Sequence, residues 1–382
     1  MNNPSYKSEK AVVVSSDMMT AYGHGEDVCW EGIMSGRTAV ADIGRFNTSA
    51  FQSGNAALIS GLKYHGQDSL VLQMFKKIFS NPSNTVPKDS ALILASTKGE
   101  IDLLEMSLLS GRGDSSECNM NNLLLKVSRL AGISGEAMVV SAACASATAA
   151  AARAAAMIRS GLKDSVVVAA CDSVTEFVYS GFSSLMALDK FPARPFDKSR
   201  SGLSLGESAG YVLLMSESRA VKEGRKIAGE VRGWGLSDDA NHMTGPSRTG
   251  EGLALAITKA MRTAGAADRD VGFISAHGTG TLYNDAMEMK SFKSVFKTGP
   301  KPVYSVKGGL GHTMGAAGLV EMIIALRALK EKTVPPTVNL KDADDDAAGW
   351  ASGSERPVGE NRSALLTNAG FSGINAALVL AG

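Results

Sequence analysis

The stretch that decides the fold runs from residue 138 to residue 161 and reads MVVSAACASATAAAARAAAMIRSG. A short apolar run typical of a buried strand leads through Cys144 into a helical segment made mostly of alanine, which Gly161 ends. A helix with small side chains around its whole surface lets neighbouring backbones approach closely on every side. Such a helix is expected in the middle of a protein, between sheets, and not at its surface.

A second stretch, residues 303–331, repeats this layout. A short apolar run leads through the turn KGGLG to His312, and a helical segment rich in alanine and glycine follows (TMGAAGLVEMIIALRALKE). The shared pattern of a polar, reactive residue between a strand and a small-residue helix suggests two duplicated halves. Two central helices in a five-layer arrangement would explain both stretches.

The rest of the chain alternates short apolar runs with longer segments of helical spacing, such as 119–131 and 249–264. Apolar runs without a period of two are typical of strands covered on both faces, so the class is α/β with mostly parallel sheets. These runs are 11–15, 91–95, 138–142, 165–171, 210–215, 271–276, 302–306, 364–368 and 375–381. The charged segment SESRAVKEGRK (216–226) separates two strands, and we place a domain boundary there, giving an N-terminal half 1–220 and a C-terminal half 221–382.

Composition excludes several classes of protein. The 382 residues carry 39 basic and 38 acidic side chains, and this balance argues against a nucleic-acid binder. The alanine-rich uncharged run between Glu136 and Arg153 is too short for a membrane span, and the polar N-terminus lacks the apolar core of a signal peptide. The four cysteines contain no CxxC pair, so we expect free thiols, no zinc site and a cytoplasmic location.

Three residues are candidates for chemistry. Cys144 lies where a strand meets a helix, where the helix dipole favours a thiolate and free backbone N–H groups can hold an oxyanion. His277, in SAHGTGT, and His312, in KGGLGHTMG, follow strands beside glycine-rich turns, where α/β proteins place ligand-binding groups. A small buried cysteine and two structural histidines remain the alternative interpretation. The sequence spacing favours no metal site.

Seven stretches, in this order along the chain, resemble the β-ketoacyl-[acyl-carrier-protein] synthases, elongating condensing enzymes of the thiolase-like superfamily. The resemblance spans nearly the whole chain and is weakest over 48–135, where the chain is also shorter than a usual member. The stretches are VVVSSDMMTAYGHGEDVCWEGIMSGRTAV (12–40), VSAACASATAA (140–150), ARPFDKSRSGLSLGESAGYVLL (193–214), SDDANHMTGPSRTGEGLALA (237–256), SAHGTGTLYNDAMEMKSF (275–292), SVKGGLGHTMGAAGLVE (305–321) and TNAGFSGINAALVL (367–380).

This resemblance implies a thiolase-like five-layer αβαβα fold with mixed, mostly parallel sheets. It also implies roles for individual residues. Cys144 matches the nucleophile that accepts the acyl group, and His277 and His312 match the two catalytic histidines. Lys307 matches a lysine that we expect to fix the tautomer or orientation of His312.

Five further residues complete the implied site. Glu288 and Asp285 match acids that organise the lysine and nearby water. The backbone N–H groups of Cys144 and Phe371 match the oxyanion hole, and Thr279 and Thr281 match residues that line the phosphopantetheine channel.

The implied activity is decarboxylative Claisen condensation between an acyl group on Cys144 and a malonyl-carrier protein, in fatty-acid, polyketide or polyene synthesis. The implied partner is an acyl carrier protein, which brings the phosphopantetheine, so the chain needs no cofactor of its own. A homodimer is expected, and a heterodimer with a homologous subunit stays open. The alternatives are a chain-length-determining partner subunit, a cysteine hydrolase and a dehydrogenase; GLGHTMG lacks the spacing of a dinucleotide fingerprint.

The chain departs from the family pattern in the C-terminal turn. The family usually has FGFGG, whereas this chain has Ala369 in place of the aromatic residue and Ser372 in place of a glycine. Ser199 and Ser201 also stand where the family usually has acids. Because the turn gates the acyl pocket in the family, acyl preference is left open.

Overall fold

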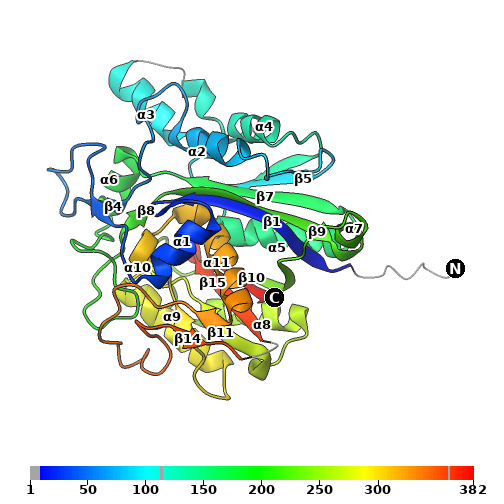
Figure 1. Cartoon of the computed structure of the whole chain (residues 1–382). Coiled ribbons are helices and arrows are strands. Elements are labelled where there is room, and N and C mark those ends of the chain that lie inside the picture. Colours follow the sequence, from blue (N-terminus) through cyan, green and yellow to red (C-terminus); the bar gives the residue numbers. More distant parts are fainter. Residues whose placement is uncertain (1–8, 112–114, 360–361) are drawn as a thin grey trace.

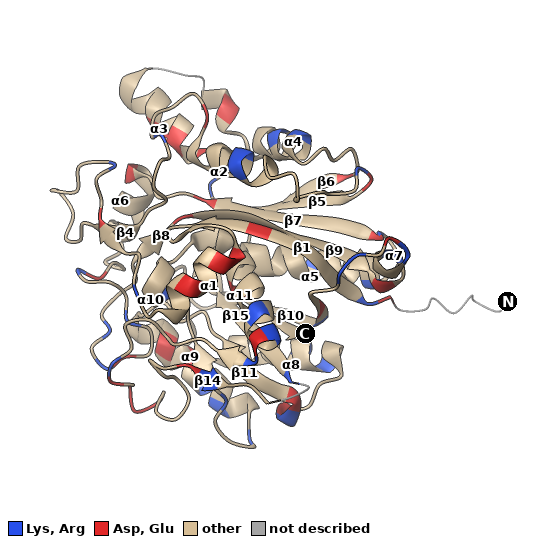
Figure 2. Cartoon of the chain, in the orientation of Figure 1, with Lys and Arg blue, Asp and Glu red and all other residues tan. Residues whose placement is uncertain are grey.

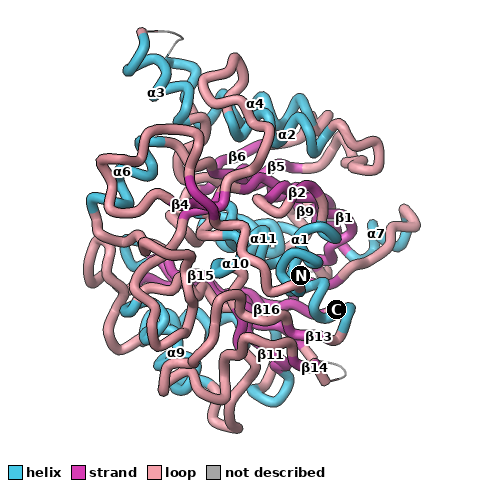
Figure 3. The backbone as a smooth tube through the Cα atoms, turned by 60° about the vertical axis from the view of Figure 1, so that its left-hand side comes forward, coloured by secondary structure: helices cyan, strands magenta, loops and turns pink. Residues whose placement is uncertain are grey.

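The computed structural model describes residues 9–111, 115–359 and 362–382. The elements form five layers (Figure 1): outer helices, one half of a large sheet, a middle layer of helices, the other half of the sheet, and outer helices again. This arrangement confirms the predicted α/β, five-layer fold. A view turned by 60° shows helices α11 (Ala317–Glu331) and α1 (Glu26–Met34) between the strands above and below them (Figure 3).

Each half of the chain contributes five strands to the main path of the 11-stranded sheet, and the short strand β2 (Gly23–His24) adds to it by pairing with β1. The N-terminal five are β1 (Ala11–Thr20), β5 (Ala91–Ala95), β6 (Ala137–Val140), β7 (Ser165–Asp172) and β9 (Ser208–Ser216). The C-terminal five are β10 (Gly229–Asp238), β11 (Val271–Ser275), β12 (Val303–Tyr304), β15 (Ser363–Ala369) and β16 (Ile374–Ala381). The order across the sheet is β12-β11-β15-β16-β10-β1-β9-β7-β5-β6.

The two sets of strands have the same topology. When each set is numbered along the chain, both have the order 3-2-4-5-1 from the outer edge to the centre. In both, four strands run in one direction and the last strand, β9 or β16, runs in the other. The halves are therefore duplicates with mixed, mostly parallel strands, as predicted. They join where β1 pairs with β10.

The predicted boundary between residues 220 and 221 falls inside the short helix α7 (Glu217–Lys222), between β9 and β10. The division into two domains at that residue stays a prediction.

The alanine-rich helices form the middle layer. Helix α5 (Ser146–Arg159) contacts β7 on one side and β10 on the other, and α11 (Ala317–Glu331) contacts both β9 and β15. The two helices also pack on each other, most closely at Gly318, where a Cβ atom would lie 2.0 Å from Thr148 Oγ1. Small residues are needed here because a larger side chain would push the helices and both half-sheets apart.

Helices cover the two outer faces. Helices α2 (Leu70–Phe79) and α4 (Met120–Leu130) cover the N-terminal half, and α8 (Glu251–Ala264) and α9 (Leu282–Val295) cover the C-terminal half. Charged residues concentrate on these outer helices and on loops (Figure 2). In the described part of the chain, no helix is both long and apolar enough to cross a membrane.

The remaining elements are short. They are β2 (Gly23–His24), α1 (Glu26–Met34), β3 (Ala41–Asp42), β4 (Asn55–Ala57), α3 (Ile101–Ser110), α6 (Glu176–Ser184), β8 (Leu205–Gly206), α10 (Lys307–Leu310), β13 (Thr333–Val334), β14 (Arg356–Pro357) and four 3₁₀ turns at Ser115–Cys118, Asp268–Asp270, Met314–Ala316 and Phe371–Gly373.

The middle layer gives a prediction about stability. Ala154 is fully buried in α5, whereas Ala156 on the same helix is only partly buried. Ala154→Leu is expected to lower the free energy of unfolding by about 1–3 kcal/mol because three extra carbon atoms have no space between the half-sheets. Ala156→Leu is the matched control, and it is expected to lower the free energy of unfolding, measured by urea denaturation, clearly less. Equal losses in the two variants would contradict the tight packing of this layer.

Candidate functional site

Cys144 lies in a tight turn between β6 and α5. The preceding residue, Ala143, has a φ of 47°, and the side chain of Ser146 closes the turn by accepting from the N–H of Ala142 and donating to the carbonyl of Ala143. The sequence predicts that the helix starts at Cys144, but it starts at Ser146. The thiol consequently lies just before the helix and is 7% exposed.

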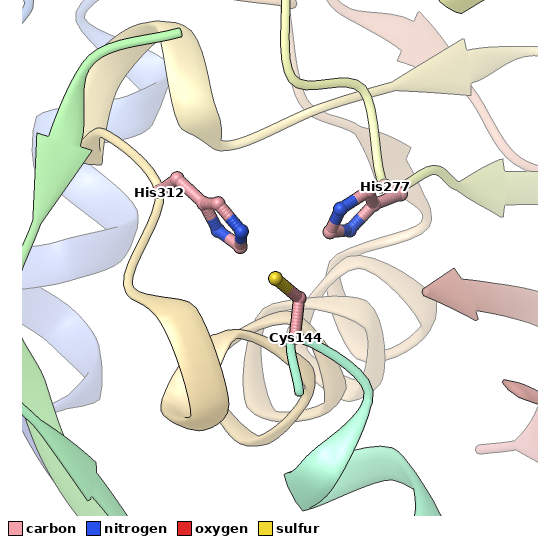
Figure 4. A group of neighbouring side chains, drawn as sticks. All are labelled: Cys144, His277 and His312. Carbon is pink, nitrogen blue, oxygen red and sulfur yellow. The ribbon is translucent and has the colours of Figure 1, made fainter. Parts of the chain in front are cut away.

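The structure brings Cys144, His277 and His312 together (Figure 4). One ligand atom of each lies within 4.8 Å of the others, and all three side chains are buried. The two imidazole rings are 5.1 Å apart between centroids and nearly perpendicular, at 86°. His277 follows β11, and His312 follows α10, with its backbone hydrogen-bonded to Ser204 and Gly206. His277 and His312 lie 133 and 168 positions after Cys144 in the sequence, and the fold brings all three to one chamber.

Burial decides the charge of all three groups. It lowers the pKa of His277 well below the usual value, and the charges of Lys307 and His312 lower it further. Burial likewise lowers the pKa of His312, with Lys307 and Lys98 contributing. Both imidazoles are therefore neutral near pH 7.

Burial also raises the pKa of the Cys144 thiol. Lys98, the backbone N–H of Phe371 and Lys307 offset the effect only in part. The sequence-based expectation of a thiolate held by the helix dipole is wrong for the resting site. The desolvation of a buried anion outweighs the dipole at a residue that lies before the helix.

Among the described residues Lys307 makes no hydrogen bond to His312; its ammonium forms a buried ion pair with Glu321 on α11. The structure therefore shows no direct contact by which Lys307 would fix the tautomer of His312, and an effect on the orientation of His312 stays a prediction. Lys307 instead acts on both imidazoles through its charge. His312 Nδ1 is buried and has no hydrogen-bond partner among the described residues.

Glu288 and Asp285 hold the loop that carries His277. Glu288 accepts the N–H of His277 at 2.8 Å and that of Gly278 at 2.7 Å. Asp285 accepts the N–H of Thr279 at 3.1 Å and also lies 3.8 Å from the Arg200 guanidinium. Burial and the nearby Asp285 raise the pKa of Glu288 to about 7. These acids thus hold the histidine loop by hydrogen bonds, whereas the ion-pair partner of Lys307 is Glu321. Lys307 interacts with Glu288 through its charge, and the expected role of the two acids in organising water stays a prediction.

The C-terminal turn closes one side of the chamber. The backbone N–H of Phe371 lies near the thiol, where it lowers the pKa of Cys144, and the oxyanion hole formed by the N–H groups of Cys144 and Phe371 stays a prediction. The Phe371 ring packs 5.8 Å from that of Phe182. Ser372 has a φ of 70°, a left-handed conformation that glycine adopts more easily, and its N–H donates to the carbonyl of Met243. Ala369 lines the cavity with a small side chain.

The chamber opens into a cavity of about 450 Å³ that contains all three central residues in its lining. Thr279 and Thr281 line it too, and their hydroxyls lie 2.9 Å apart. Most of the other lining residues are apolar, among them Phe182, Leu203 and Leu282. A thioester on a flexible arm can therefore reach the thiol past the two threonines.

Sequence reasoning missed three polar residues near the chamber. Glu321 is the only acid in the apolar first part of α11, and Asn368 is a polar residue near the end of the apolar strand β15. Lys98 follows the buried strand β5; its ammonium lies 2.9 Å from Thr97 Oγ1 and 5.9 Å from the Phe182 ring centroid. Each breaks an apolar or strand-end pattern, and this signal was available in the sequence.

The thiol and two imidazoles are also a ligand set that zinc uses. The sequence argued against a metal because no thiol lies near a histidine along the chain, but the fold removes that objection. No carboxylate joins these three donors in the cluster of described residues. The hydrogen bonds of the ring nitrogens determine whether this set can bind a metal or donates to a substrate.

Lys98 gives a prediction about the thiol. Because its charge lowers the pKa of Cys144, Lys98→Met is expected to raise that pKa and to shift the pH profile of Cys144 alkylation by iodoacetamide to higher pH. Lys330→Met, at the exposed end of α11, is the control and is expected to leave the profile unchanged. A Lys98→Met profile that overlays the wild-type profile would contradict the electrostatic role.

Comparison with known proteins places the chain in a family. The model of the "Beta-ketoacyl synthase, N-terminal domain" matches residues 110–220, and that of the "Beta-ketoacyl synthase, C-terminal domain" matches residues 228–341. The chain is 30% identical, over 97% of its own length and 98% of the relative's, to 3-oxoacyl-[acyl-carrier-protein] synthase 2 of Vibrio cholerae. It is 34% identical, over 67% of its length and 58% of the relative's, to the mitochondrial 3-oxoacyl-[acyl-carrier-protein] synthase of Arabidopsis thaliana.

Solved structures agree in fold. The ishigamide ketosynthase/chain length factor superposes with a TM-score of 0.88 at 29% identity, covering 98% of this chain and 99% of that one. A β-ketoacyl synthase from Burkholderia phymatum superposes with a TM-score of 0.85 at 23% identity, over 98% and 99% of the two chains. The resemblance found in the sequence motifs is confirmed: the chain belongs to the β-ketoacyl synthase family.

Proposed function

We propose that this chain condenses an acyl group, carried on Cys144, with malonyl-[acyl-carrier-protein], releasing CO₂ and extending a fatty-acid, polyketide or polyene chain by two carbons. The observation that supports this activity most strongly is the convergence of one buried thiol and two neutral imidazoles on a single cavity. A cysteine hydrolase needs one imidazole and a group to orient it, whereas this site has two imidazoles facing the sulfur.

In the first half-reaction, Cys144 sulfur attacks the thioester carbonyl of the acyl-carrier protein. The thiol proton leaves as the S–C bond forms and ends on the departing phosphopantetheine thiol. The N–H groups of Cys144 and Phe371 stabilise the tetrahedral oxyanion. A soft sulfur nucleophile suits this step because the resulting thioester is reactive toward carbon nucleophiles in the next one.

In the second half-reaction, the malonyl thioester loses CO₂ and its carbonyl oxygen takes up the negative charge. N–H groups of His277 and His312 stabilise this enolate by hydrogen bonding, which neutral imidazoles do without first losing a proton to solvent. The enolate carbon attacks the acyl carbonyl on Cys144, a C–C bond forms, and the cysteine thiolate leaves and is reprotonated.

The carrier protein is proposed as the partner on the basis of the relatives, whose names state that substrate. Its phosphopantetheine arm would pass Thr279 and Thr281 to the sulfur, so the chain needs no cofactor of its own. The four cysteines are free, which supports a reducing location such as the cytoplasm.

A second candidate function, that of a chain-length-determining subunit in a heterodimer, is favoured by one observation. The ishigamide ketosynthase/chain length factor is among the similar structures. The complete set of Cys144, His277 and His312 favours the catalytic role within any such pair. We propose a dimer, with a homodimer as the simpler form and a heterodimer with a homologous subunit as the alternative.

Intact-mass analysis with a panel of acyl-carrier proteins tests the nucleophile. The wild-type chain is expected to gain the mass of the acyl group, and Cys144→Ala is expected to gain none because no other residue offers a thiol in the chamber. Cys29→Ala, at a buried cysteine outside the cavity, is the control and is expected to be acylated. Absence of an adduct with every donor, alone and with a sibling subunit, would overturn the catalytic role.

His277→Ala and His312→Ala test the division between the two half-reactions. Each variant is expected to retain acylation of Cys144. The rate at which it decarboxylates malonyl-[acyl-carrier-protein] is expected to fall by about 10²–10³-fold, the usual cost of removing one preorganised oxyanion donor. Release of CO₂ from the malonyl carboxyl group measures this rate. A His277→Ala variant that decarboxylates at the wild-type rate would contradict the assignment.

A further inference from the structure

We propose that Asn368 is a positioning residue that holds His277 in one tautomer, with its proton on Nε2, and thereby makes the ring a hydrogen-bond donor toward the chamber and a poor metal ligand. This inference rests on the proposed function, because it concerns the ring that would stabilise the enolate. Its basis is a chain of buried polar contacts that links four separate elements behind the chamber.

Asn368 is fully buried near the end of β15, and each of its side-chain atoms has a partner. Its Nδ2 lies 2.7 Å from Glu321 Oε2 and 3.1 Å from His277 Nδ1. Its Oδ1 accepts the hydroxyl of Thr148 on α5. The amide orientation follows from the neighbours, because the opposite one would place the carbonyl oxygen against a carboxylate oxygen of Glu321.

The two hydrogens on the amide nitrogen of Asn368 then determine the tautomer of His277. An amide nitrogen carries two hydrogens and has no acceptor capacity. One hydrogen goes to Glu321, whose other oxygen is paired with the Lys307 ammonium, and the second goes to His277 Nδ1. Nδ1 must therefore accept, and a neutral ring that accepts at Nδ1 carries its proton on Nε2.

The two histidines consequently differ. His277 has a tautomer set by the protein, whereas His312 Nδ1 has no partner among the described residues and leaves its proton free to take either nitrogen. Lys307 is connected to His277 by polar contacts through Glu321 and Asn368, whereas no hydrogen bond among the described residues joins Lys307 to His312. The lysine and the acid thus support the histidine on the opposite loop by way of one amide.

The same contact bears on metal binding. Histidines that bind metals present a lone pair to the ion and donate the N–H of their other nitrogen to an acceptor. Here the other nitrogen of His277 receives an N–H from Asn368. Nε2 keeps its proton and cannot ligate zinc without losing it, although thiol and imidazoles lie within 4.8 Å of one another.

The isosteric variant Asn368→Asp reverses this arrangement. The oxygen that replaces Nδ2 lies between Glu321 Oε2 and His277 Nδ1, so the two carboxyl groups are expected to share one proton. The same oxygen then accepts an N–H from Nδ1, and the lone pair of the ring moves to Nε2 and faces the chamber. Malonyl decarboxylation is expected to fall by about 10²–10⁴-fold, the range measured when a donor is lost or a catalytic histidine is put in the wrong tautomer. Acylation of Cys144, read by intact mass, is expected to persist.

Two further readouts distinguish a tautomer change from general damage. In ¹⁵N spectra of the wild-type chain, His277 is expected to show a pyridine-type Nδ1 and a pyrrole-type Nε2. In Asn368→Asp the assignment is expected to be reversed, with a pyrrole-type Nδ1 and a pyridine-type Nε2. Thr148→Val, which removes the partner of Oδ1 and leaves both amide hydrogens in place, is the control and is expected to keep the wild-type pattern. Zinc is expected to inhibit the acylation of Asn368→Asp at a concentration at least roughly tenfold lower than the one that inhibits wild type.

A protonated Nδ1 in the wild-type spectrum would overturn the proposal, even if the variant does not fold. Decarboxylation by a folded Asn368→Asp at the wild-type rate, or equal zinc affinity in the two proteins, would overturn it as well. These outcomes leave the proposed function intact if wild type is acylated and condenses. Failure of wild type to be acylated counts against the proposed function itself.

Discussion

Exclusion of water from the chamber is the constraint on which the rest of the site depends. Cys144, His277 and His312 are almost fully buried, and burial is the largest cause of each pKa shift. The same desolvation that keeps both imidazoles neutral keeps the thiol protonated, so none of these three groups carries a charge in the resting site. Hydrogen-bond donors in such a dry site are stronger than in water and need no reorganisation when charge develops on the thioester oxygen.

The middle layer makes this exclusion possible. The alanine-rich helix α5 and the helix α11 approach each other closely, and Gly318 permits the contact with Thr148. Thr148, Glu321 and Asn368 lie at the place where these helices meet β15, so the polar support of His277 is built into the most tightly packed part of the fold. A fully partnered network in such surroundings is rigid, because an unmade hydrogen bond there is costly.

Sequence patterns predicted the fold well because the alanine-rich stretch and the repeated strand–turn–helix layout leave few other arrangements. The motifs also predicted Cys144, His277 and His312, which the fold brings into one chamber. The partners of these residues were less predictable. Lys307 pairs with Glu321 and not with Glu288 or Asp285, because α11 passes behind the chamber while α9 supports the loop of His277. Asn368 and Lys98 break an apolar or strand-end pattern in the sequence, but the partners that they reach follow from tertiary packing, which no spacing along the chain encodes.

The account makes one central claim, that the imidazoles beside the thiol are neutral donors under working conditions. The most direct test is a titration of the His277 and His312 ring signals by NMR, assigned with the single alanine variants. The account predicts that both rings stay uncharged from about pH 8 down to pH 6, through the range where an ordinary histidine takes up its proton. Protonation of either ring near the ordinary pKa of histidine would contradict it.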